Sequence, residues 1–523
     1  MVTDQPVAAR KISSVNPATG EVLRELDCAN EGEVHSAVAR ARSAQTDWAE
    51  IGVRKRIAVL REFQRRLHEK KSDVTEAISR EAGKPVAEAL TTEVLVVLEA
   101  ARFLIENAYR LLRDEPVPHG NLATKLKSGR LMREPYGVVG IISPWNYPFS
   151  IPATETLAAL VAGNAVVLKP SEFTSLVALE LKSLLHAAGV PGNVFQVLVG
   201  DGATGAALIH SQIDKLVFTG SVATGKRIAA IAVERLLPVV LELGGKDPMV
   251  VLDDADVDVT SSAAVWGGFV NAGQTCLSVE RCYVHRRLYE RFLKACAEKT
   301  KKLCVGSGLD PETDVGPMIH QRQLQIVEAH VEDAVARGAR VLAGGSRSPE
   351  RGANFYQPTV LADVTHEMRI MREETFGPVL PVMAFDSEDE AVRLANDSDF
   401  GLAASVWTRD NARGERLARR IQAGTVMVND VVSCFGLSEA PHGGVKSSGV
   451  GRTHGRFGLE EMVRLKYVDS DLMPGMKKVW WYGYGARFAR HMEGFLDMQF
   501  ARRVETRLSG ALRAAGVIRR KRL

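Results

Sequence analysis

Two reactive side chains stand close to glycines in this sequence. Cys276 ends the turn-like segment GQTC, and Glu242 is followed by two glycines in ELGGK. A cysteine thiolate is a strong nucleophile near neutral pH, and a carboxylate at a strand end can act as a general base. A lone cysteine also suits a buried apolar position, and a lone glutamate suits the surface. Neither residue identifies a reaction by itself.

Two glycine-rich turns are candidates for binding phosphate. GDGATG (200–205) matches a dinucleotide fingerprint that includes Gly202, but the next strand, KLVFTG, lacks the terminal acidic residue that holds a ribose in that fold. A tight turn between strand and helix is therefore the favoured interpretation. In FTGSVATG (218–225), Ser221 can cap a helix whose N-terminus offers amide donors to phosphate. A capped helix without a ligand is the alternative.

The apolar residues that would position these groups change their spacing along the chain. From about Glu31 to Leu112 they recur every three or four residues, which predicts amphipathic helices. From Gly137, short Val/Ile/Leu runs alternate with helical stretches, and a second such series begins near Pro248. This alternation predicts two α/β lobes with parallel sheets. Segments 121–132 and 462–471 are predicted strands outside both lobes, able to pair with each other or with another subunit.

Composition limits the classes of protein that this chain can form. It has 523 residues, 46% hydrophobic and 25% charged, which is typical of a folded globular chain of several domains. We expect no transmembrane span or signal peptide, because no apolar run reaches about 18 residues and the first residues lack an apolar core. The six cysteines form no C-x-x-C pair, so we expect a reducing, cytoplasmic location without disulfides or a metal site.

Positive charge is concentrated at the C-terminus. The formal net charge is +4, yet Pro474 to Leu523 hold 12 Lys and Arg against 3 Asp and Glu. The rest of the chain is net negative and has no basic stripe, so nucleic acid is not an expected partner. Aromatic residues 480–484 lie beside Lys477 and Lys478, and apolar residues at helical spacing follow, which predicts an interfacial helix in peripheral contact with a membrane. A helix packed on the protein's own surface or across a dimer is the alternative.

Six motifs form a specific pattern when they are taken in order. They are PWNYP (144–148), KPSE (169–172), FTGS (218–221), ELGGK (242–246), GQTC (273–276) and EETFGP (373–378). In this order and at these separations they resemble the aldehyde dehydrogenase superfamily, over about Val15 to Asp471. The resemblance implies a two-lobed α/β fold and a homodimer or homotetramer. The implied domains are a Rossmann-like NAD-binding domain (1–119 and 137–244), a catalytic domain (245–446), oligomerisation strands (120–136 and 462–472) and a basic aromatic tail (473–523).

The same resemblance implies a role for each motif. Cys276 would attack an aldehyde carbonyl, Asn146 and the Cys276 amide would bind the oxyanion, and Glu242 would activate water to hydrolyse the thioester. Hydride would pass to NAD or NADP. The carboxylate of Glu172 beside the adenosine ribose favours NAD over NADP, which stays the alternative cofactor. The implied cofactor-binding residues are Trp145, Lys169, Glu172, Gly202, Gly220, Ser221, Gly225, Glu374 and Phe376.

Departures from the family pattern bear on the base and the substrate. Thr453 stands where some relatives carry a second glutamate, so Glu242 must act as the base alone. The implied substrate neighbours are largely apolar: Tyr147, Ile151, Thr275, Leu277 and Phe435. They include no arginine to hold a substrate carboxylate, which disfavours succinate semialdehyde. The WWY element (480–482) also resembles family members that act on apolar, carotenoid-type aldehydes, so an apolar substrate is predicted.

Three alternatives to this function differ in their chemistry. A succinate-semialdehyde-type dehydrogenase would need a cation beside the substrate. A CoA-acylating relative transfers its acyl group to a thiol and needs no water-activating base, so Glu242 argues against it. A catalytically idle, membrane-associated scaffold has no need of Cys276, Glu242 and Asn146 together. We therefore expect an NAD(P)-dependent enzyme that oxidises an aldehyde to a carboxylic acid.

Overall fold

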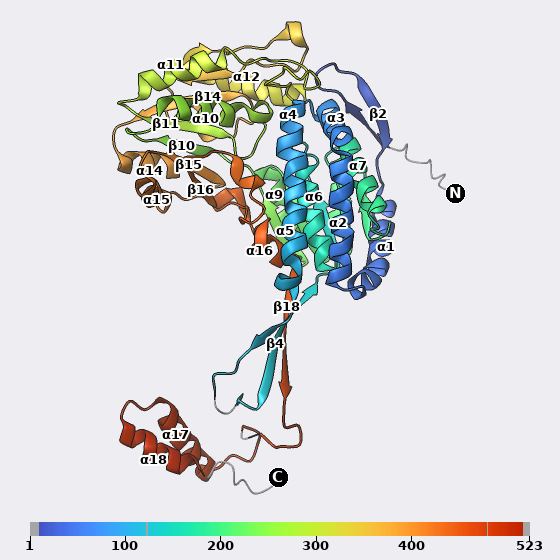
Figure 1. Cartoon of the computed structure of the whole chain (residues 1–523), viewed down its shortest axis with the longest axis vertical. Coiled ribbons are helices and arrows are strands. Elements are labelled where there is room, and N and C mark those ends of the chain that lie inside the picture. Colours follow the sequence, from blue (N-terminus) through green and yellow to red (C-terminus); the bar gives the residue numbers. More distant parts are fainter. Residues whose placement is uncertain (1–9, 122–123, 479, 516–523) are drawn as a thin grey trace, which may run out of the picture. The chain divides into compact units, whose positions relative to one another are not determined.

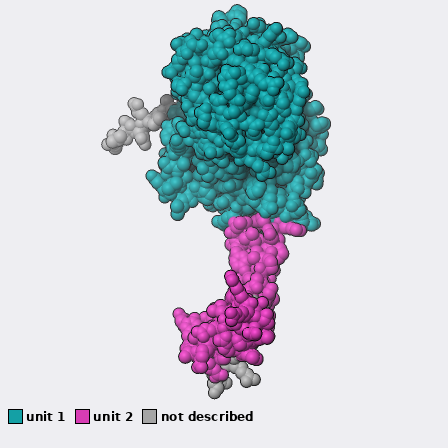
Figure 2. All heavy atoms as spheres, turned by 90° about the vertical axis from the view of Figure 1, so that its left-hand side faces the viewer, with its two compact units in different colours: residues 1–112, 134–464 teal, residues 113–133, 465–523 magenta. Residues whose placement is uncertain are grey.

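The computed structural model describes residues 10–121, 124–478 and 480–515 (Figure 1). These residues form two compact units (Figure 2). Unit 1 comprises the described residues of 1–112 and 134–464, and unit 2 those of 113–133 and 465–523. Unit 1 contains two large sheets, each with its own hydrophobic core.

The first sheet of unit 1 has the strand order β17-β9-β8-β5-β6-β7, and every strand except β17 is parallel to its neighbours. Its strands are β5 (Val138–Ile142), β6 (Ala165–Lys169), β7 (Phe195–Val197), β8 (Lys215–Thr219), β9 (Val239–Glu242) and β17 (Gly449–Val450). The chain runs from β5 outwards to β6 and β7, and then returns to β8 on the other side. The strand order therefore reverses between β5 and β8, and open α/β sheets bind ligands outside the carboxyl ends of strands at such a point.

Helices cover both faces of this sheet (Figure 1). Those before it are α1 (Glu31–Glu50), α2 (Val53–Glu69), α3 (Lys71–Ala82), α4 (Val86–Ala89), a π-helical turn (Leu90–Val94) and α5 (Leu95–Leu112). Those between strands are α6 (Ser150–Ala162), α7 (Ser175–Ala187), α8 (Gly202–His210) and α9 (Val222–Glu234). The predicted three- and four-residue spacing is seen on α2, where Leu60, Phe63 and Leu67 are buried. An antiparallel hairpin of β1 (Lys11–Val15) and β2 (Val22–Asp27), which the sequence did not predict, precedes α1.

The second sheet of unit 1 has the order β12-β13-β14-β11-β10-β15-β16. Its strands are β10 (Asp247–Val251), β11 (Val279–His285), β12 (Arg340–Ala343), β13 (Thr359–Ala362), β14 (Val379–Phe385), β15 (Ala403–Trp407) and β16 (Thr425–Val428). Its helices are α10 (Val257–Phe269), α11 (Tyr289–Thr300), α12 (Gln321–Ala336), α13 (Arg369–Arg372), α14 (Glu388–Asn396) and α15 (Asn411–Ala418), and α16 (Gly455–Glu460) follows β17.

One strand of the second sheet departs from the predicted parallel arrangement. β12 pairs antiparallel with β13, whereas the other neighbours are parallel. Residues 344–358 connect β12 to β13 without an α-helix. They contain a short 3-10 turn (Pro349–Arg351) and an isolated antiparallel bridge between Arg347 and Tyr356. A parallel pair needs a crossover connection, usually helical, so this loop reverses the chain instead.

Unit 2 contains a three-stranded sheet and a helical hairpin. β4 (Lys127–Pro135) lies between β3 (Glu115–Val117) and β18 (Val463–Asp471), so the two segments predicted as strands outside the lobes pair with each other. The helices α17 (Ala486–Phe500) and α18 (Val504–Ala514) approach closely at Gly494, where a Cβ would lie 2.8 Å from the Gly510 carbonyl oxygen. The sequence predicted a single helix here. Among the described residues, no helix is long and apolar enough to cross a membrane.

Candidate active site

Cys276 lies on a sharply bent loop that follows α10. Asn271 and Ala272 both adopt left-handed backbone angles with φ of 54°. Gly273 has a φ of 70°, and a Cβ at this position would lie 2.1 Å from the carbonyl oxygen of Gly377. The loop brings Cys276 to a point where three cavities meet.

The first cavity, of about 880 Å³, lies at the carboxyl ends of the strands where the order of the first sheet reverses. Asn146 follows β5, Gly220 and Ser221 follow β8, and Glu242 ends β9. The other residues that line it are Pro144, Trp145, Ile151, Thr219, Leu243, Gly244, Cys276, Gln323, Ile326, Glu374 and Phe376. Eight of the predicted site residues therefore face one cavity.

The second cavity, of about 810 Å³, has no Asp, Glu, Lys, Arg or His in its lining. It contains all five predicted substrate neighbours, Tyr147, Ile151, Thr275, Leu277 and Phe435, together with Thr91, Thr92, Val96, Trp266, Val432, Ser433 and Gly436. The third cavity, of about 340 Å³, joins Cys276 to Glu242 and His442. Cys276 thus separates a polar cavity from an apolar one.

Four predicted cofactor-binding residues do not line the first cavity. Lys169 ends β6, is buried, and lies 3.4 Å from the carboxylate of Glu172. Gly202 begins α8. Gly225 lies in the first turn of α9 and packs against Leu243, where a Cβ would come within 2.5 Å of the leucine side chain. Gly225 therefore permits close packing of this helix in the structure.

Hydrogen bonds join the loop of Cys276 to the turn after β5. The Asn146 side-chain amide donates to the carbonyl oxygen of Gln274 at 3.0 Å, and the Asn271 amide donates to the Asn146 carbonyl at 2.9 Å. The hydroxyls of Tyr147 and Thr275 lie 2.8 Å apart. Asn146 is 4% exposed, so its amide is held in a fixed, water-poor position beside Cys276.

A buried ion pair that sequence reasoning missed supports this turn. Glu93 accepts hydrogen bonds from the backbone N–H groups of Phe149 and Ser150 at 2.8 and 2.9 Å, and from Lys84 Nζ at 2.7 Å. The side chains of Glu93 and Lys84 are fully buried. A usable signal was present, because Glu93 precedes the buried Val97 by four residues and so interrupts an apolar helical stripe.

A second buried ion pair, also missed, holds the loop of Glu374 and Phe376. Glu280 pairs with Lys246 and accepts the backbone N–H of Phe376 at 2.8 Å. Glu374 accepts the backbone N–H of Gly245 at 3.0 Å. Burial raises the pKa of Glu374 to about 8. Glu374 lines the first cavity, and among the described residues the Gly245 N–H is the one backbone group that donates a hydrogen bond to its side chain.

The second glycine of ELGGK is required by the loop of Cys276. A Cβ on Gly245 would lie 2.3 Å from the carbonyl oxygen of Cys276, closer than any side chain could approach. The motif around Glu242 and the loop of Cys276 are thus in contact through their backbones, which explains why a residue without a side chain stands there.

Burial controls the protonation of the reactive groups. It raises the pKa of Glu242 well above its ordinary value, and the nearby charge of Glu155 adds to the shift. Burial and the neighbouring carboxylates also raise the pKa of the Cys276 thiol. His442 Nε2 lies 3.8 Å from Glu242, but burial lowers the pKa of His442 to about 3. Both shifts favour the protonated forms, so both groups become more reactive as the pH rises.

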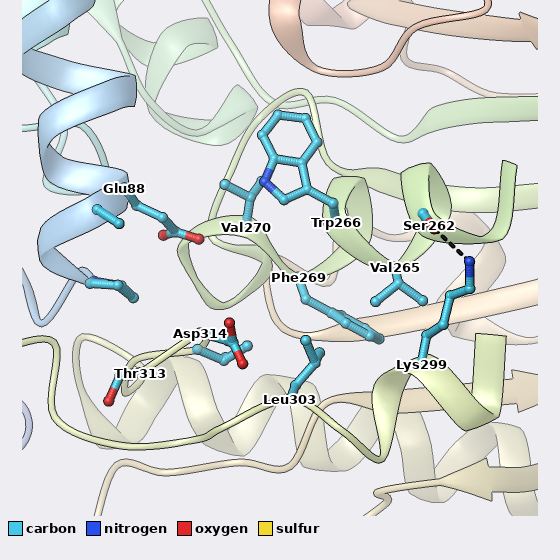
Figure 3. Close-up of a pocket in the computed structure, with 13 residues that line it drawn as sticks. Glu88, Ser262, Val265, Trp266, Phe269, Val270, Lys299, Leu303, Thr313 and Asp314 are labelled. Atoms are coloured by element: carbon cyan, nitrogen blue, oxygen red, sulfur yellow. Dashed lines mark hydrogen bonds between the residues drawn. The ribbon is translucent and has the colours of Figure 1, made fainter. Parts of the chain in front are cut away.

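A separate cavity of about 850 Å³ borders the other end of the same loop (Figure 3). Glu88, next to this cavity, accepts the backbone N–H of Asn271 at 2.9 Å. Trp266 lines both this cavity and the apolar one. Figure 3 shows Lys299 directed at Ser262, to which it donates a hydrogen bond. Glu88 therefore holds the backbone of Asn271, whose left-handed conformation bends the loop of Cys276.

Comparisons with known proteins agree with this architecture. The chain matches the model of the Aldehyde dehydrogenase family over residues 4–468. It is 42% identical over 491 residues to 4,4′-diapolycopene aldehyde oxidase of Methylomonas sp, covering 93% of this chain and 91% of the relative. The structure resembles the NAD+ complex of an aldehyde dehydrogenase from Bacillus cereus, with a TM-score of 0.85, 36% identity and coverage of 88% and 94%. It also resembles succinate-semialdehyde dehydrogenase from Burkholderia pseudomallei, with a TM-score of 0.84, 36% identity and coverage of 88% and 95%.

Proposed function

The chain belongs to the aldehyde dehydrogenase family, and from that premise we propose that it oxidises apolar aldehydes to carboxylic acids, with NAD as hydride acceptor. The observation that carries the substrate class is the cavity of about 810 Å³ that ends at Cys276 and offers no cation. A substrate carboxylate placed there would lose its hydration without gaining a charged partner. Similarity to a relative named for a diapolycopene aldehyde supports the proposal.

In the proposed reaction, Glu242 takes the proton of the Cys276 thiol and releases it to water. The thiolate then attacks the carbonyl carbon, and the C=O π electrons move to oxygen. One amide hydrogen of Asn146 is donated to Gln274, and the other would bind the oxyanion together with the Cys276 N–H. Bound NAD would supply the hydride acceptor. Glu242 then removes a proton from the water that attacks the thioester, and the Cys276 thiolate leaves as the acid forms.

The residues of the first cavity fit a dinucleotide. Ser221 caps α9 by accepting the Thr224 N–H at 3.3 Å, and the N-terminus of a helix favours phosphate. Gly244 leaves room for the Glu374 carboxylate, which a Cβ would approach to 2.5 Å. We assign Glu374 and Phe376 to the nicotinamide ribose and ring. The remaining proposed cofactor contacts are Trp145, Lys169, Glu172, Gly202, Gly220 and Gly225.

For straight-chain aldehydes, kcat/KM should rise by about fourfold with each added methylene until the cavity is filled, because each buried CH₂ contributes about 0.8 kcal/mol. Succinic semialdehyde should be a poorer substrate than butanal. Val96→Arg, which adds a cation to the cavity lining, should move the preference towards succinic semialdehyde.

These rates are measured as NAD reduction by the purified full-length protein, with and without CoA. A wild-type preference for succinic semialdehyde over butanal would contradict the apolar substrate. A requirement for CoA would favour the acylating alternative, and no oxidation of any aldehyde would favour the idle scaffold.

Glu172→Ser should raise the use of NADP relative to NAD by about fivefold or more. A carboxylate beside a ribose repels a 2′-phosphate, and two unit charges about 4 Å apart in water interact with about 1 kcal/mol. The ratio of kcat/KM for the two cofactors measures the change. Glu180→Ser, on α7, removes the same charge elsewhere and should leave the ratio unaltered. An unchanged ratio in Glu172→Ser would place the ribose elsewhere.

We also propose a homo-oligomer that forms through β18. This nine-residue strand pairs with β4 on one edge, and within the described residues no strand is paired with its other edge. Leu465 and Tyr467 are 62% and 48% exposed. A long strand with a free edge and exposed apolar side chains is a template for pairing with another chain.

The helical hairpin of unit 2 supports a proposed peripheral contact with an anionic membrane. On α18, Val504, Leu508 and Leu512 recur every four residues and are 69%, 64% and 81% exposed. Arg502, Arg503 and Arg507 lie beside this stripe in the sequence. An apolar stripe flanked by arginines is the pattern of a helix that lies in a membrane interface.

Full-length protein should therefore sediment with vesicles that contain phosphatidylserine at low salt, and bind far less to neutral vesicles. Leu508→Asp with Leu512→Asp should abolish the binding. Ser509→Asp adds a charge to the same helix outside the stripe and should weaken binding only slightly. Wild-type protein that stays in the supernatant, or equal loss of binding in both variants, would refute the contact.

A further inference from the structure

The apolar cavity at Cys276 adjoins another cavity that the proposed reaction does not employ. The apolar cavity is the one of about 810 Å³, and its neighbour, the distal cavity, is the one of about 850 Å³ in Figure 3. Trp266 is the one described residue that lines both. It is 45% exposed, so its indole lies at an opening and is not part of a closed core. Trp266 therefore marks the boundary between the two cavities.

One side of helix α10 forms a wall of the distal cavity. Four of its residues recur every three or four positions, which places them on the same side of the helix, and line this cavity: Ser262, Val265, Trp266 and Phe269. Figure 3 shows Val265, Trp266 and Phe269 on this helix, with Glu88 across the cavity from them. Because Trp266 also lines the apolar cavity, α10 is a wall that both cavities share.

The opposite wall of both cavities is also a single stretch of chain. Ala87 and Glu88 of α4 line the distal cavity, and Thr91 and Thr92, one turn later, line the apolar cavity. The Thr91 hydroxyl donates a hydrogen bond to the carbonyl oxygen of Ala87 at 2.8 Å. The Thr92 hydroxyl donates to the carbonyl oxygen of Glu88 at 2.7 Å. Both threonines lie in the π-helical turn Leu90–Val94, and such turns are frequent at functional sites. The two cavities thus follow one another along a single gap between this stretch and α10.

The charged side chains that line the distal cavity already have protein partners. Glu88 accepts the backbone N–H of Asn271 at 2.9 Å. Lys299 donates to the carboxylate of Asp258 at 2.7 Å, and Asp314 accepts a backbone N–H at 2.7 Å. The rest of the lining is largely apolar. A hydrocarbon chain can therefore enter the distal cavity and leave water without displacing these hydrogen bonds.

We propose that the two cavities form one channel for long-chain apolar aldehydes, with the carbonyl at Cys276 and the far end of the chain in the distal cavity. The chain crosses from one cavity to the other beside the indole of Trp266. A short chain such as that of butanal is held by the apolar cavity alone, whereas the chain of dodecanal continues into the distal cavity. The inference rests on the proposed function and narrows its substrate class from apolar aldehydes to long-chain ones.

Ala87→Trp tests the channel because it fills the distal cavity from the side of α4, and Ala87 is not part of the apolar cavity. We expect KM for dodecanal to rise by roughly 10²-fold with kcat unchanged, because three or four methylenes leave the cavity and each contributes about fourfold to binding. KM and kcat for butanal should keep their wild-type values, which also shows that the variant is folded. Ala87→Leu adds a smaller side chain and should raise KM for dodecanal less. NAD reduction by the full-length protein measures these constants.

Val259→Trp is the matched control. It adds the same side chain to α10 at a residue that is 56% exposed and lines neither cavity. It should oxidise dodecanal with the KM of the wild type. A wild-type KM for dodecanal in Ala87→Trp, or an equal rise in Val259→Trp, would overturn the distal cavity as a substrate site and leave the proposed function standing.

Equilibrium dialysis with dodecanol gives a readout that needs no turnover, because this alcohol has the same chain but no aldehyde carbon. The wild type should bind dodecanol roughly 10²-fold more tightly than Ala87→Trp does. Equal affinity of the two proteins for dodecanol would overturn the channel. A wild-type enzyme that oxidises neither butanal nor dodecanal would instead overturn the proposed function, whatever the result of the dialysis.

Discussion

Replacing Cys276 with alanine should abolish aldehyde oxidation, with a loss of roughly 10⁵-fold or more in kcat, as expected when a covalent nucleophile is removed. Asn146 and Glu242 remain in place in this variant, but neither can form the covalent intermediate. The initial rate of NAD reduction with a good apolar aldehyde measures the loss. NAD binding, followed by calorimetry, should be unchanged because Cys276 lies at the end of the first cavity.

Cys304→Ser is the matched control, since it removes an exposed cysteine that lines none of the three cavities that meet at Cys276. It should retain wild-type activity. In the wild type, activity should increase with pH above neutrality, because burial raises the pKa of the Cys276 thiol and of Glu242. Residual turnover by Cys276→Ala, or a rate that falls between pH 7 and 9, would contradict the assignment of Cys276 as the nucleophile.

The sequence predicted the local features of the site because each has a local cause. The apolar runs that end at Ile142, Thr219 and Glu242 are strands, and parallel strands in one sheet bring their carboxyl ends to the same edge. The glycines after Glu242 and before Cys276 mark turns. That these distant positions form one site was predicted from the resemblance of the six ordered motifs to the aldehyde dehydrogenase superfamily. The comparisons confirm the α/β fold class.

The supporting groups were missed because their partners are distant in the chain. Glu93 meets Ser150, and Lys246 meets Glu280, only after the sheets have formed. β17 joins β9 from more than two hundred residues away and carries too few residues to show any period. The burial of Glu155 was not predicted, because a single glutamate in a helical window is ordinarily exposed. Glu155 is buried only because α5 and α16 pack against α6.

Glu242→Gln should stop the reaction after the first hydride transfer. Glutamine fills the same space at the end of β9 but cannot take a proton from water, so the thioester on Cys276 should persist. We expect the steady-state rate to fall by about 10²- to 10⁴-fold, while one equivalent of reduced NAD per Cys276 is formed in the first turnover. Rapid mixing measures this burst, and intact-mass spectrometry should detect the acylated enzyme.

This stalled enzyme also separates hydrolysis from acyl transfer to CoA. Hydroxylamine, a strong nucleophile that needs no base, should release the acyl group and restore turnover, whereas CoA should do so only if the cavity admits it. The burst itself should become faster as the pH rises, because Cys276 must then lose its proton without Glu242. A wild-type steady-state rate in Glu242→Gln, or a burst without an acylated enzyme, would show that another group activates the water.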